Sequence, residues 1–449
     1  MGTASELLDA RKALQRILDD RAKRFLFFRK KIYYESGNKT GKYLAKALRE
    51  HIHSNTILGI KGANNKLDVS NEAIAEHFHS YYKALYNLPQ QHRPPGMVGN
   101  RSQVIQDFLI KSGLPILDTT DTGVLEDKIT PSEIQEVIKK LKTGKSPGPD
   151  GFTAIYYRSL PDILSEPLAK ALNSLSNQRE VTPDWLSAHI TVLPKPNKDP
   201  TECTRYRPIS LLYLDVNFFS KIIANRLTPL LQSLIGPEQV GFMPGREARD
   251  NIIKAMLLIH AADPLDIKGL LLSTDAEKAF DRVAWDYMLA TCSHIGLGPK
   301  MLTWISSLYQ NPTARLKING TLSGKVHISN GTRQGYPLSP LLFILSLEPF
   351  IRTVNAESAI NGFRVKDREY KVSAFVDDLL FFLVNPHTTI PNLISKFTQF
   401  GYVSNLKINY AKSEAMNIKS RPKSGLPAGV KPCEFTPAAQ CEPGQIINV

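Results

Sequence analysis

The chain has 449 residues, of which 42% are hydrophobic and 22% charged, and its formal net charge is +14. No apolar run approaches the roughly 18 residues of a membrane-spanning helix, and the N-terminus lacks the basic-then-apolar pattern of a signal peptide. We therefore expect an intracellular protein without a transmembrane segment. The cysteines at positions 203, 292, 433 and 441 are too scattered for a disulfide framework or a zinc site, so we expect free thiols.

The excess of positive charge favours a polyanionic partner, and nucleic acid first. Residues 1–50 hold 13 Lys and Arg against 6 Asp and Glu, so half of the excess lies there. Between residues 21 and 46 the cations alternate with Phe and Tyr, which suits a groove that binds phosphates and stacks bases. A basic amphipathic helix with its rings in a core explains the same pattern.

Residues 1–100 are expected to form a basic helical extension that ends at the Pro-rich stretch 87–100. Helical periodicity covers 5–34 and 71–86, and a polar loop is expected at 59–66. The next helix should begin at Thr130, because a Thr N-cap, a Pro at the first helical position and a Glu at the third occur there in order.

Beyond that helix the apolar patterns alternate between the periods of helices and strands. The expected helices are 161–177, 215–235, 246–261, 338–354 and 393–400, and the expected strands are 189–196, 268–275 and the two halves of 371–384. An Asn-Gly pair at 319–320 predicts a hairpin across 314–329. The segment 421–449 is rich in Pro and Gly, and we expect a disordered tail there.

Two adjacent carboxylates, Asp377 and Asp378, interrupt the apolar run 372–384. Buried unpaired carboxylates are costly and raise each other's pKa, so these two stand either in a solvated hairpin turn or beside a cation. Asp275 also ends an apolar strand. If the strands are neighbours, three acids meet at one point, where Mg²⁺ is the natural occupant. Two such ions about 4 Å apart can activate a 3′-hydroxyl and stabilise departing pyrophosphate.

Eight stretches, in order, resemble the motifs of the reverse transcriptases of non-LTR retrotransposons, the long interspersed elements of vertebrates. They are KSPGPDGF (145–152), LPKPNKDP (193–200), YRPISLL (206–212), GFMPGREARDNI (241–252), LSTDAEKAFD (272–281), GTRQGYPLSP (331–340), FVDD (375–378) and LKINYAKSE (406–414). The resemblance covers most of residues 1–420. It implies an α/β (α+β) fold of the right-hand polymerase type, with fingers and palm, in which helices flank an antiparallel palm sheet. The implied polymerase domain is 101–420, with its core at about 175–420.

The resemblance gives the acids a role. Asp275 and Asp377 would ligate two metal ions, Mg²⁺ or alternatively Mn²⁺, and Asp378 would complete the site. A merely structural role is the alternative for Asp378. Lys412 would donate a proton to the leaving pyrophosphate. The implied reaction is RNA-directed addition of deoxynucleotides to a primer 3′-end. Its partners would be an RNA template, a DNA primer and deoxynucleoside triphosphates, in the nucleus or the cytoplasm.

The resemblance also outlines a nucleotide site. Phe280, five residues after Asp275, would clash with a ribose 2′-hydroxyl and so select deoxynucleotides, whereas the residues alone favour a core ring. Lys195 and Arg207 would hold the triphosphate, as cations do through charge-assisted contacts. Either is as readily a surface charge in so basic a chain. Gln334 and Gly335 would shape the floor beneath the template base and the nucleotide, where Gly allows close backbone approach.

The chain also departs from the family pattern. Tyr336 stands where the family usually has Cys, close to the nucleotide, and the tail does not resemble a thumb. With neither an endonuclease segment nor a Cys/His knuckle in view, we expect a fragment of an element's polyprotein. A relic that only binds RNA is the main alternative, and an RNA-binding protein that uses the N-terminal segment is the next. A nuclease is disfavoured, because no His or extra acid cluster accompanies the site in the sequence. Glu277, Asp281 and Asp286 are expected on helix surfaces rather than as metal ligands.

Overall fold

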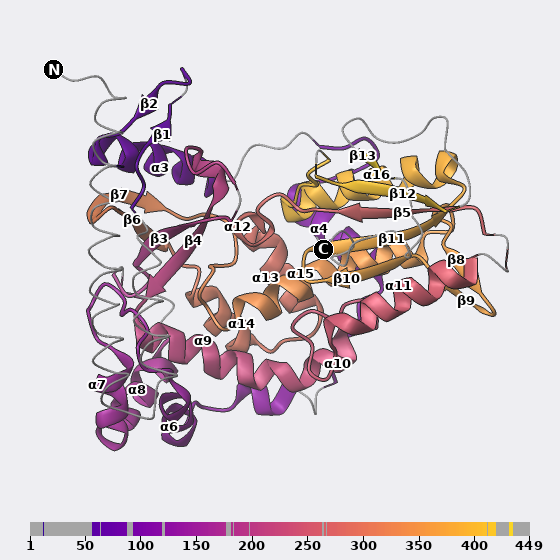
Figure 1. Cartoon of the computed structure of the whole chain (residues 1–449). Coiled ribbons are helices and arrows are strands. Elements are labelled where there is room, and N and C mark those ends of the chain that lie inside the picture. The colour runs from indigo at the N-terminus through magenta and orange to yellow at the C-terminus, as the bar shows by residue number, and fades with distance from the viewer. Residues whose placement is uncertain are drawn as a thin grey trace, which may run out of the picture. The chain divides into compact units, whose positions relative to one another are not determined.

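The computed structural model describes residues 12, 56–62, 64–87, 93–118, 122–176, 181–182, 184–196, 198–262, 265, 267–410, 412–418 and 431–433. The chain divides into two compact units, shown together in Figure 1. Unit 1 takes in the described parts of 1–84, 187–211 and 313–326, and unit 2 takes in the described parts of 85–186, 212–312 and 327–449. The expected helix 5–34 and nearly all of the expected tail lie outside the described residues. The expected division at about residues 100 and 420 stays a prediction.

Unit 1 is built on a four-stranded sheet with the order β4-β3-β6-β7. Its elements are β1 (Ile60–Lys61), β2 (Leu67–Asp68), α3 (Asn71–Leu85), β3 (Ala188–Pro194), η2 (Cys203–Arg205), β4 (Tyr206–Leu212), β6 (Thr313–Ile318) and β7 (Thr321–His327). The expected helix 71–86, strand 189–196 and Asn-Gly hairpin are confirmed as α3, β3 and β6–β7. The polar loop expected at 59–66 instead contains the short strand β1, which pairs with β2 just after it, and Ile60 is fully buried there.

Unit 2 contains a five-stranded sheet with the order β10-β11-β5-β12-β13. Its strands are β5 (Gly269–Thr274), β10 (Val372–Phe375), β11 (Asp378–Val384), β12 (Glu414–Ile418) and β13 (Lys431–Cys433), and β8 (Phe363–Val365) pairs separately with β9 (Arg368–Tyr370). The pairs β10–β11, β11–β5 and β5–β12 are antiparallel, and β12–β13 is parallel. The expected strands 268–275 and 371–384 are confirmed as β5 and as β10 with β11.

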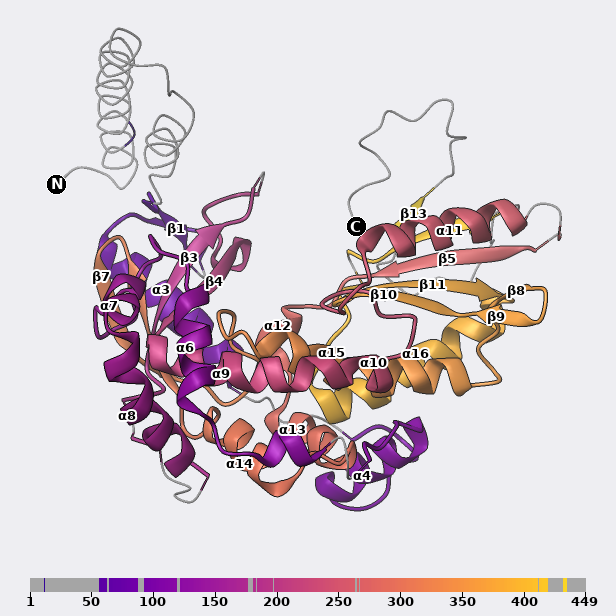
Figure 2. The ribbon, with the colours of Figure 1, turned by 90° about the horizontal axis from the view of Figure 1, so that it is seen from below.

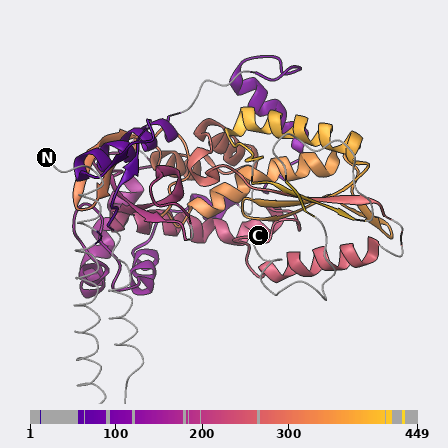
Figure 3. The same ribbon diagram turned by 45° about the horizontal axis from the view of Figure 1, so that its top comes forward.

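Helices cover both faces of this sheet (Figures 2 and 3). On β11, neighbouring side chains point to opposite faces, as a strand requires. Phe382 packs with Leu258 and Ala262 of α11 (Ala248–Ala262). The ring of Phe381 lies 5.6 Å from that of Phe397 on α16 (Pro386–Ser404). In the apolar run that contains Asp377 and Asp378, the strand β11 is therefore buried on both faces of the sheet.

The remaining helices of unit 2 lie before β5, between β5 and β6, and before β8. They are α4 (Arg101–Ser112), η1 (Val124–Glu126), α6 (Pro131–Lys140), α7 (Ala154–Ser159), α8 (Pro161–Ser174), α9 (Leu214–Leu227), η3 (Thr228–Leu230), α10 (Leu231–Leu234), α12 (Ala279–Arg282), α13 (Trp285–His294), α14 (Pro299–Ser307) and α15 (Ser339–Ala356). The capping box predicted at Thr130 and Glu133 is present at the start of α6. The single helix expected over 215–235 is divided into three, because Pro229 cannot donate an intrahelical hydrogen bond.

The expected class, mixed helices and sheets with antiparallel strands, is confirmed in the described residues. Among these residues no helix combines the length and the apolar character that a membrane span needs. The hairpin β10–β11, the end of β5 and the start of β12 lie at the same edge of the unit 2 sheet, as their pairing requires. The three predicted acids belong to this edge.

Candidate active site

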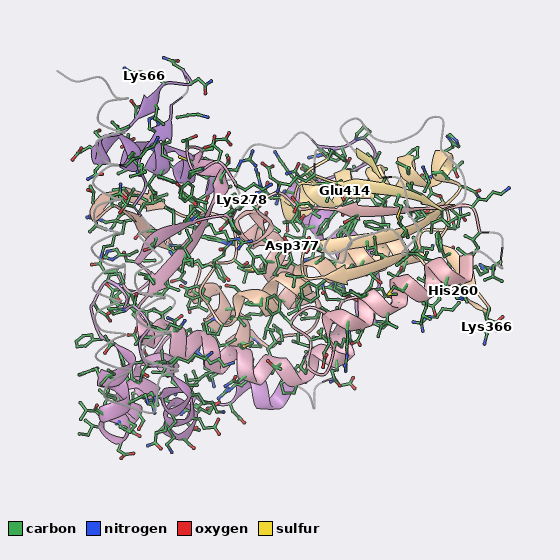
Figure 4. All side chains as sticks on the ribbon, in the orientation of Figure 1. Lys66, His260, Lys278, Lys366, Asp377 and Glu414 are labelled. Atoms are coloured by element: carbon green, nitrogen blue, oxygen red, sulfur yellow. The ribbon has the colours of Figure 1, made fainter. Side chains whose placement is uncertain are left out.

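Strand pairing brings the acids of unit 2 together. Strands β5 and β11 are antiparallel with Thr274 opposite Leu379, so Asp275 and Asp378, the next residue on each strand, meet at one edge. Asp377 lies in the turn between β10 and β11, and Figure 4 labels it at that end of the sheet. The sequence-based prediction that two strands deliver three acids to one place therefore matches this structure. All three side chains are partly exposed.

The two adjacent acids are not the two central residues of the turn between β10 and β11. Phe375 pairs with Asp378, so the two central residues are Val376 and Asp377, and Asp378 already belongs to β11. Val376 has a φ of 60°. A two-residue turn with positive φ at its first central position normally has Gly there, and a β-branched residue in that region is strained by about 1–3 kcal/mol. Such strain persists only where the surroundings hold it.

The local electrostatics favour a cation at this edge. Burial, followed by the neighbouring carboxylates of Asp378 and Asp275, raises the pKa of Asp377 to about 6. Burial and the carboxylate of Asp275 likewise raise the pKa of Asp378. Lys412 acts against both shifts. The three carboxylates thus hold more negative charge than the ammonium of Lys412 offsets, which a bound cation would relieve.

Lys412 reaches the acids because its segment runs beside the end of β5. Ala276 and Ile408 form an antiparallel bridge, and the Asn409 amide donates to the carbonyl of Asp275 at 2.8 Å. Lys412 Nζ lies 2.8 Å from Asp275 Oδ2, with half of the lysine side chain exposed. The structure therefore places Lys412, predicted as a proton donor, in direct contact with one of the three acids, Asp275.

A divalent cation fits the chemistry of these donors, although the acids are not closed around one. Across the described residues, no three His, Cys, Asp or Glu side chains are grouped so that they could hold a metal ion. Mg²⁺ commonly takes one or two protein carboxylates and completes its shell with water and substrate phosphates. Two half-buried carboxylates with raised pKa values are donors that gain from such an ion.

Phe280 follows the first acid on the short helix α12. Its ring stacks on that of Phe343 of α15, with centroids 4.5 Å apart and planes 19° from parallel. Its carbonyl accepts a hydrogen bond from the Thr332 amide at 2.6 Å. Because the ring is only half-buried, it is not the fully enclosed core side chain that the residues alone favoured.

Gln334 and Gly335 lie in the loop before α15, where Gln334 is half-buried and Gly335 is exposed. The loop is fixed at its start, since Gly331 donates to the Val283 carbonyl at 2.7 Å. An added Cβ at Gly331 would meet the backbone of Asp281 at 2.6 Å, so only Gly fits there. Gln334 and Gly335 thus belong to the same unit as Phe280 and the three acids.

Tyr336, the departure from the family pattern, turns toward the interior. Its side chain is 2% exposed, and Arg333 Nη1 lies 3.5 Å from its hydroxyl. The same guanidinium donates to the Leu186 carbonyl at 2.6 Å. Tyr336 is therefore a core ring of unit 2.

Lys195 and Arg207 belong to unit 1, where Lys195 directly follows β3 and Arg207 lies on the neighbouring strand β4. Strand β3 ends at Pro194, and the Lys195 amide donates to the Arg205 carbonyl at 2.8 Å. Arg207, on β4, is exposed, whereas Lys195 is half-buried. The two predicted triphosphate ligands are therefore close to each other in sequence and in the sheet of unit 1.

Of the three acids expected on helix surfaces, Asp286 is confirmed, because it is exposed on α13 and pairs with Arg101. Glu277 is exposed and pairs with Arg282 at 3.1 Å, but it lies in the turn before α12 and not on a helix. Asp281 is only 2% exposed, and the hydroxyl of Tyr86 lies 3.4 Å from its Oδ1. The short helix α12 turns this side chain inward, which the surface prediction did not anticipate.

The sequence analysis gave no role to Gln239, yet this fully buried side chain contacts the acid-bearing turn. Its Oε1 accepts from the Val376 amide at 2.8 Å and its Nε2 donates to the Val376 carbonyl at 3.0 Å. The only signal in the sequence is an amide two residues before Gly241, where the motif GFMPGREARDNI begins. An amide in that position predicts nothing by itself.

The chain belongs to a known family. The family model described as reverse transcriptase (RNA-dependent DNA polymerase) matches residues 193–436, which is more than half of the chain. The matched range contains every predicted site residue. The chain therefore belongs to the reverse transcriptase family, and its relatives come from non-LTR retrotransposons, which confirms the resemblance seen in the motifs. Proteins of this family generally use divalent metal ions.

Several curated relatives resemble the chain over much of its length. The transposon TX1 uncharacterized 149 kDa protein of Xenopus laevis is 28% identical over 370 residues, 82% of this chain and 26% of that protein. The retrovirus-related Pol polyprotein from the R2DM element of Drosophila melanogaster is 27% identical over 286 residues, 63% of this chain and 26% of its own length. The RNA-directed DNA polymerase from mobile element jockey of Drosophila funebris is 24% identical, with 76% and 36% covered. The chain thus spans about a quarter to a third of these relatives.

Proposed function

We propose that the chain is an RNA-directed DNA polymerase that adds deoxynucleotides to a primer 3′-end by metal-assisted phosphoryl transfer. The observation that carries the proposal is the meeting of Asp275, Asp377 and Asp378 at one sheet edge, inside the family match. A protein that only binds RNA is not favoured by the family or by the names of the relatives. In this proposal unit 2 carries the palm, and unit 1 contributes to the fingers.

The three carboxylates would hold two Mg²⁺ ions, with Mn²⁺ as the alternative, and these supply the positive charge that polymerase chemistry requires at the reacting phosphate. Asp275 and Asp377 would be the principal ligands and Asp378 the third. The raised pKa of Asp377 supports this role, because a buried carboxylate that is costly to ionise alone is stabilised by a cation. The rigid sheet edge keeps the carboxylates in position before substrate arrives.

Lys412 would have two partners in turn. In the structure it neutralises part of the charge of Asp275, at 2.8 Å. When a nucleotide and its metal ions occupy the carboxylates, the ammonium would be released toward the triphosphate, where it can donate a proton to the departing pyrophosphate. The exposed half of the side chain gives it the freedom to move.

The other predicted residues would form the nucleotide and template sites. Phe280 would exclude the ribose 2′-hydroxyl with a ring that Phe343 supports from behind. Lys195 and Arg207 would bind the triphosphate, and Gln334 with Gly335 would form the floor beneath the template base. The substrates would be an RNA template, a DNA primer and deoxynucleoside triphosphates. The net charge of +14 suits these polyanions.

The first test is primer extension on poly(rA)–oligo(dT) with Mg²⁺, comparing the full chain with Asp377→Ala. Loss of one charged group that acts on the transition state costs at least about a hundredfold in rate, so extension should be nearly abolished. The matched control is Asp367→Ala, which removes an exposed carboxylate from the turn between β8 and β9. If Asp377→Ala extends primers as well as Asp367→Ala does, the proposed function is wrong.

The role of Phe280 is tested by Phe280→Ala with ribonucleotides in place of deoxynucleotides. Removing the ring should raise ribonucleotide incorporation by about tenfold or more, which is the range of steric discrimination in a pocket. Deoxynucleotide incorporation by the same variant is the internal control for general damage. An unchanged preference for deoxynucleotides would remove Phe280 from the site.

A further inference from the structure

The strained turn that carries Asp377 is held from outside the hairpin by one side chain. Gln239 is fully buried, and both ends of its amide group contact the backbone of Val376. Oε1 accepts from the Val376 amide at 2.8 Å, and Nε2 donates to the Val376 carbonyl at 3.0 Å. These two bonds fix both peptide groups of a residue whose φ is 60°. They therefore set the direction in which the chain enters Asp377.

The segment around Gln239 continues this contact along β10. Gln239 forms a parallel bridge with Ala374, whose amide donates to the Glu238 carbonyl at 2.9 Å and whose carbonyl accepts from the Val240 amide at 3.0 Å. Gly241 lies against the turn itself. A Cβ added there would lie 2.5 Å from Val376 Cγ2 and 2.6 Å from its nitrogen, so no other residue allows this approach.

Two polar side chains of the motif GFMPGREARDNI hold this contact in place, one on the segment around Gln239 and one on β10. Arg246 donates to the carbonyl of Gln239 at 2.7 Å and to that of Ile235 at 3.2 Å. Asn251, on α11, donates to the carbonyl of Ala374 at 2.9 Å. We call residues 239–241 with Arg246 and Asn251 the hairpin brace. The brace gives this motif a physical role of its own, although its residues are neither the carboxylates nor the predicted nucleotide-site residues.

We infer that Gln239 is a positioning residue for Asp377, and that the hairpin brace keeps the Val376 turn in its strained conformation so that the carboxylate meets its cation in a fixed direction. This inference rests on the proposed function. The φ of 60° at Val376 is strained for a β-branched residue, and strain persists at functional sites where the surrounding contacts over-determine it. Without those contacts the turn would relax toward negative φ at Val376, and the next residue, Asp377, would turn with it.

The test uses three variants of the full chain. Gln239→Met keeps the volume and the apolar stem of the side chain but removes the two hydrogen bonds to Val376 and a third that Oε1 accepts from the Gly241 amide at 2.8 Å. The double variant Gln239→Met with Val376→Gly adds a residue that adopts positive φ without strain, so the turn no longer depends on the brace. Thr291→Val is the matched control, because it removes a hydrogen bond of another fully buried side chain, from Oγ1 to the Tyr287 carbonyl at 2.9 Å.

Three measurements separate a positioning role from a merely structural one. We expect Gln239→Met to raise amide exchange in the peptide 373–380 and to weaken Mn²⁺ binding, measured by electron paramagnetic resonance, by about 10–100-fold. The turnover number for primer extension should fall by a similar factor. The double variant should recover part of both losses, and Thr291→Val should change neither.

The inference is overturned if Gln239→Met leaves exchange in 373–380 unchanged. It is also overturned if exchange rises while Mn²⁺ affinity and turnover match those of Thr291→Val, since Gln239 would then stabilise the hairpin without directing its carboxylate. Failure of the proposed function gives a different result, because Asp377→Ala would then bind Mn²⁺ and extend primers like the unmodified chain.

Discussion

Among the described two-residue hairpin turns, which also include Lys366-Asp367 between β8 and β9, two are held in opposite ways. The turn between β6 and β7 is Asn319-Gly320, with φ values of 49° and 86°, both of which these residue types adopt readily. The turn between β10 and β11 is Val376-Asp377, with Val376 at a φ of 60° that its β-branched side chain disfavours. The first turn supports its neighbours, since the Asn319 side chain bonds both backbone groups of Ile57. The second is supported by Gln239.

The difference separates a turn that folds by itself from one that the rest of the protein must fix. A local sequence preference is sufficient at Asn319-Gly320, and such a hairpin needs no distant residue. At Val376-Asp377 the local preference opposes the observed backbone, and residues more than a hundred positions away supply the missing stabilisation. Strain of this kind is expected where geometry matters more than stability.

A buried carboxylate on α15, that of Glu348, contacts the segment that leads into the hairpin brace. Glu348 is 1% exposed, and its Oε1 accepts from the Gly236 amide at 3.0 Å, just before the brace begins. Arg352 Nε lies 2.7 Å from the same oxygen. Burial nevertheless outweighs these contacts and raises the pKa of Glu348 to about 7. The protonation state of this carboxyl group, which supports the segment before the brace, therefore changes within the neutral pH range.

The largest effect expected when this contact is altered is a change in how the free energy of unfolding depends on pH. Because the folded-state pKa of Glu348 lies above its unfolded value of 4.5, the folded state binds more protons between those values. The free energy of unfolding then decreases as pH rises from about 4.5 to about 7, by a few kcal/mol for this group. Glu348→Gln should remove that decrease and be the more stable protein at pH 7.5, because Gln can still accept from Gly236.

The measurement is urea unfolding followed by tryptophan fluorescence at pH 5 and at pH 7.5. All three tryptophans, at 185, 285 and 304, belong to unit 2, so the signal reports the unit that contains Glu348. Glu277→Gln, which neutralises an exposed carboxylate of the same unit, is the control. Parallel pH dependence of the unmodified chain and Glu348→Gln would show that Glu348 does not titrate in this range.

The contrast between the hairpins also explains how much of the fold the sequence could predict. The β6–β7 hairpin and the capping box of α6 were predicted from local signals that the structure shares. The helices α4, α13 and α14 were not predicted. The helix expected over 215–235 was predicted too long, since its apolar period continues past the break at Pro229. Packing within unit 2 determined these details, and a single sequence contains little of that information.

Within the site, the residues proposed to carry the chemistry were easier to predict than the residues that hold them in position. Asp275, Asp377 and Asp378 could be predicted because charge within a buried strand is costly and therefore conspicuous. The register of the turn was predicted one residue late, because two adjacent Asp resemble turn residues more than Val does. Gln239 could not be predicted at all. Its importance lies in two hydrogen bonds across 137 positions of sequence, which no local pattern records.

The smallest effect is expected at the relaxed hairpin, where Gly320→Ala sharpens the comparison. No atom lies within 4 Å of an added Cβ, so the substitution tests the φ of 86° alone. Alanine pays for that conformation in the folded state, and we expect a loss of about 1 kcal/mol. Unit 1 contains no tryptophan, so the measurement is amide exchange in the peptide 313–327.

Gly324→Ala, on the same hairpin, is the control for Gly320→Ala. Gly324 lies outside the positive-φ region, and its added Cβ would make an ordinary contact of 3.4 Å with His79. Exchange should therefore rise in Gly320→Ala and stay the same or fall in Gly324→Ala. Equal exchange in the two variants would mean that the β6–β7 turn tolerates alanine at positive φ. The two hairpins would then be alike, because the Asn-Gly turn would also be held by tertiary contacts and not by local preference alone. The contacts of Asn319 with Ile57 would be the first of these.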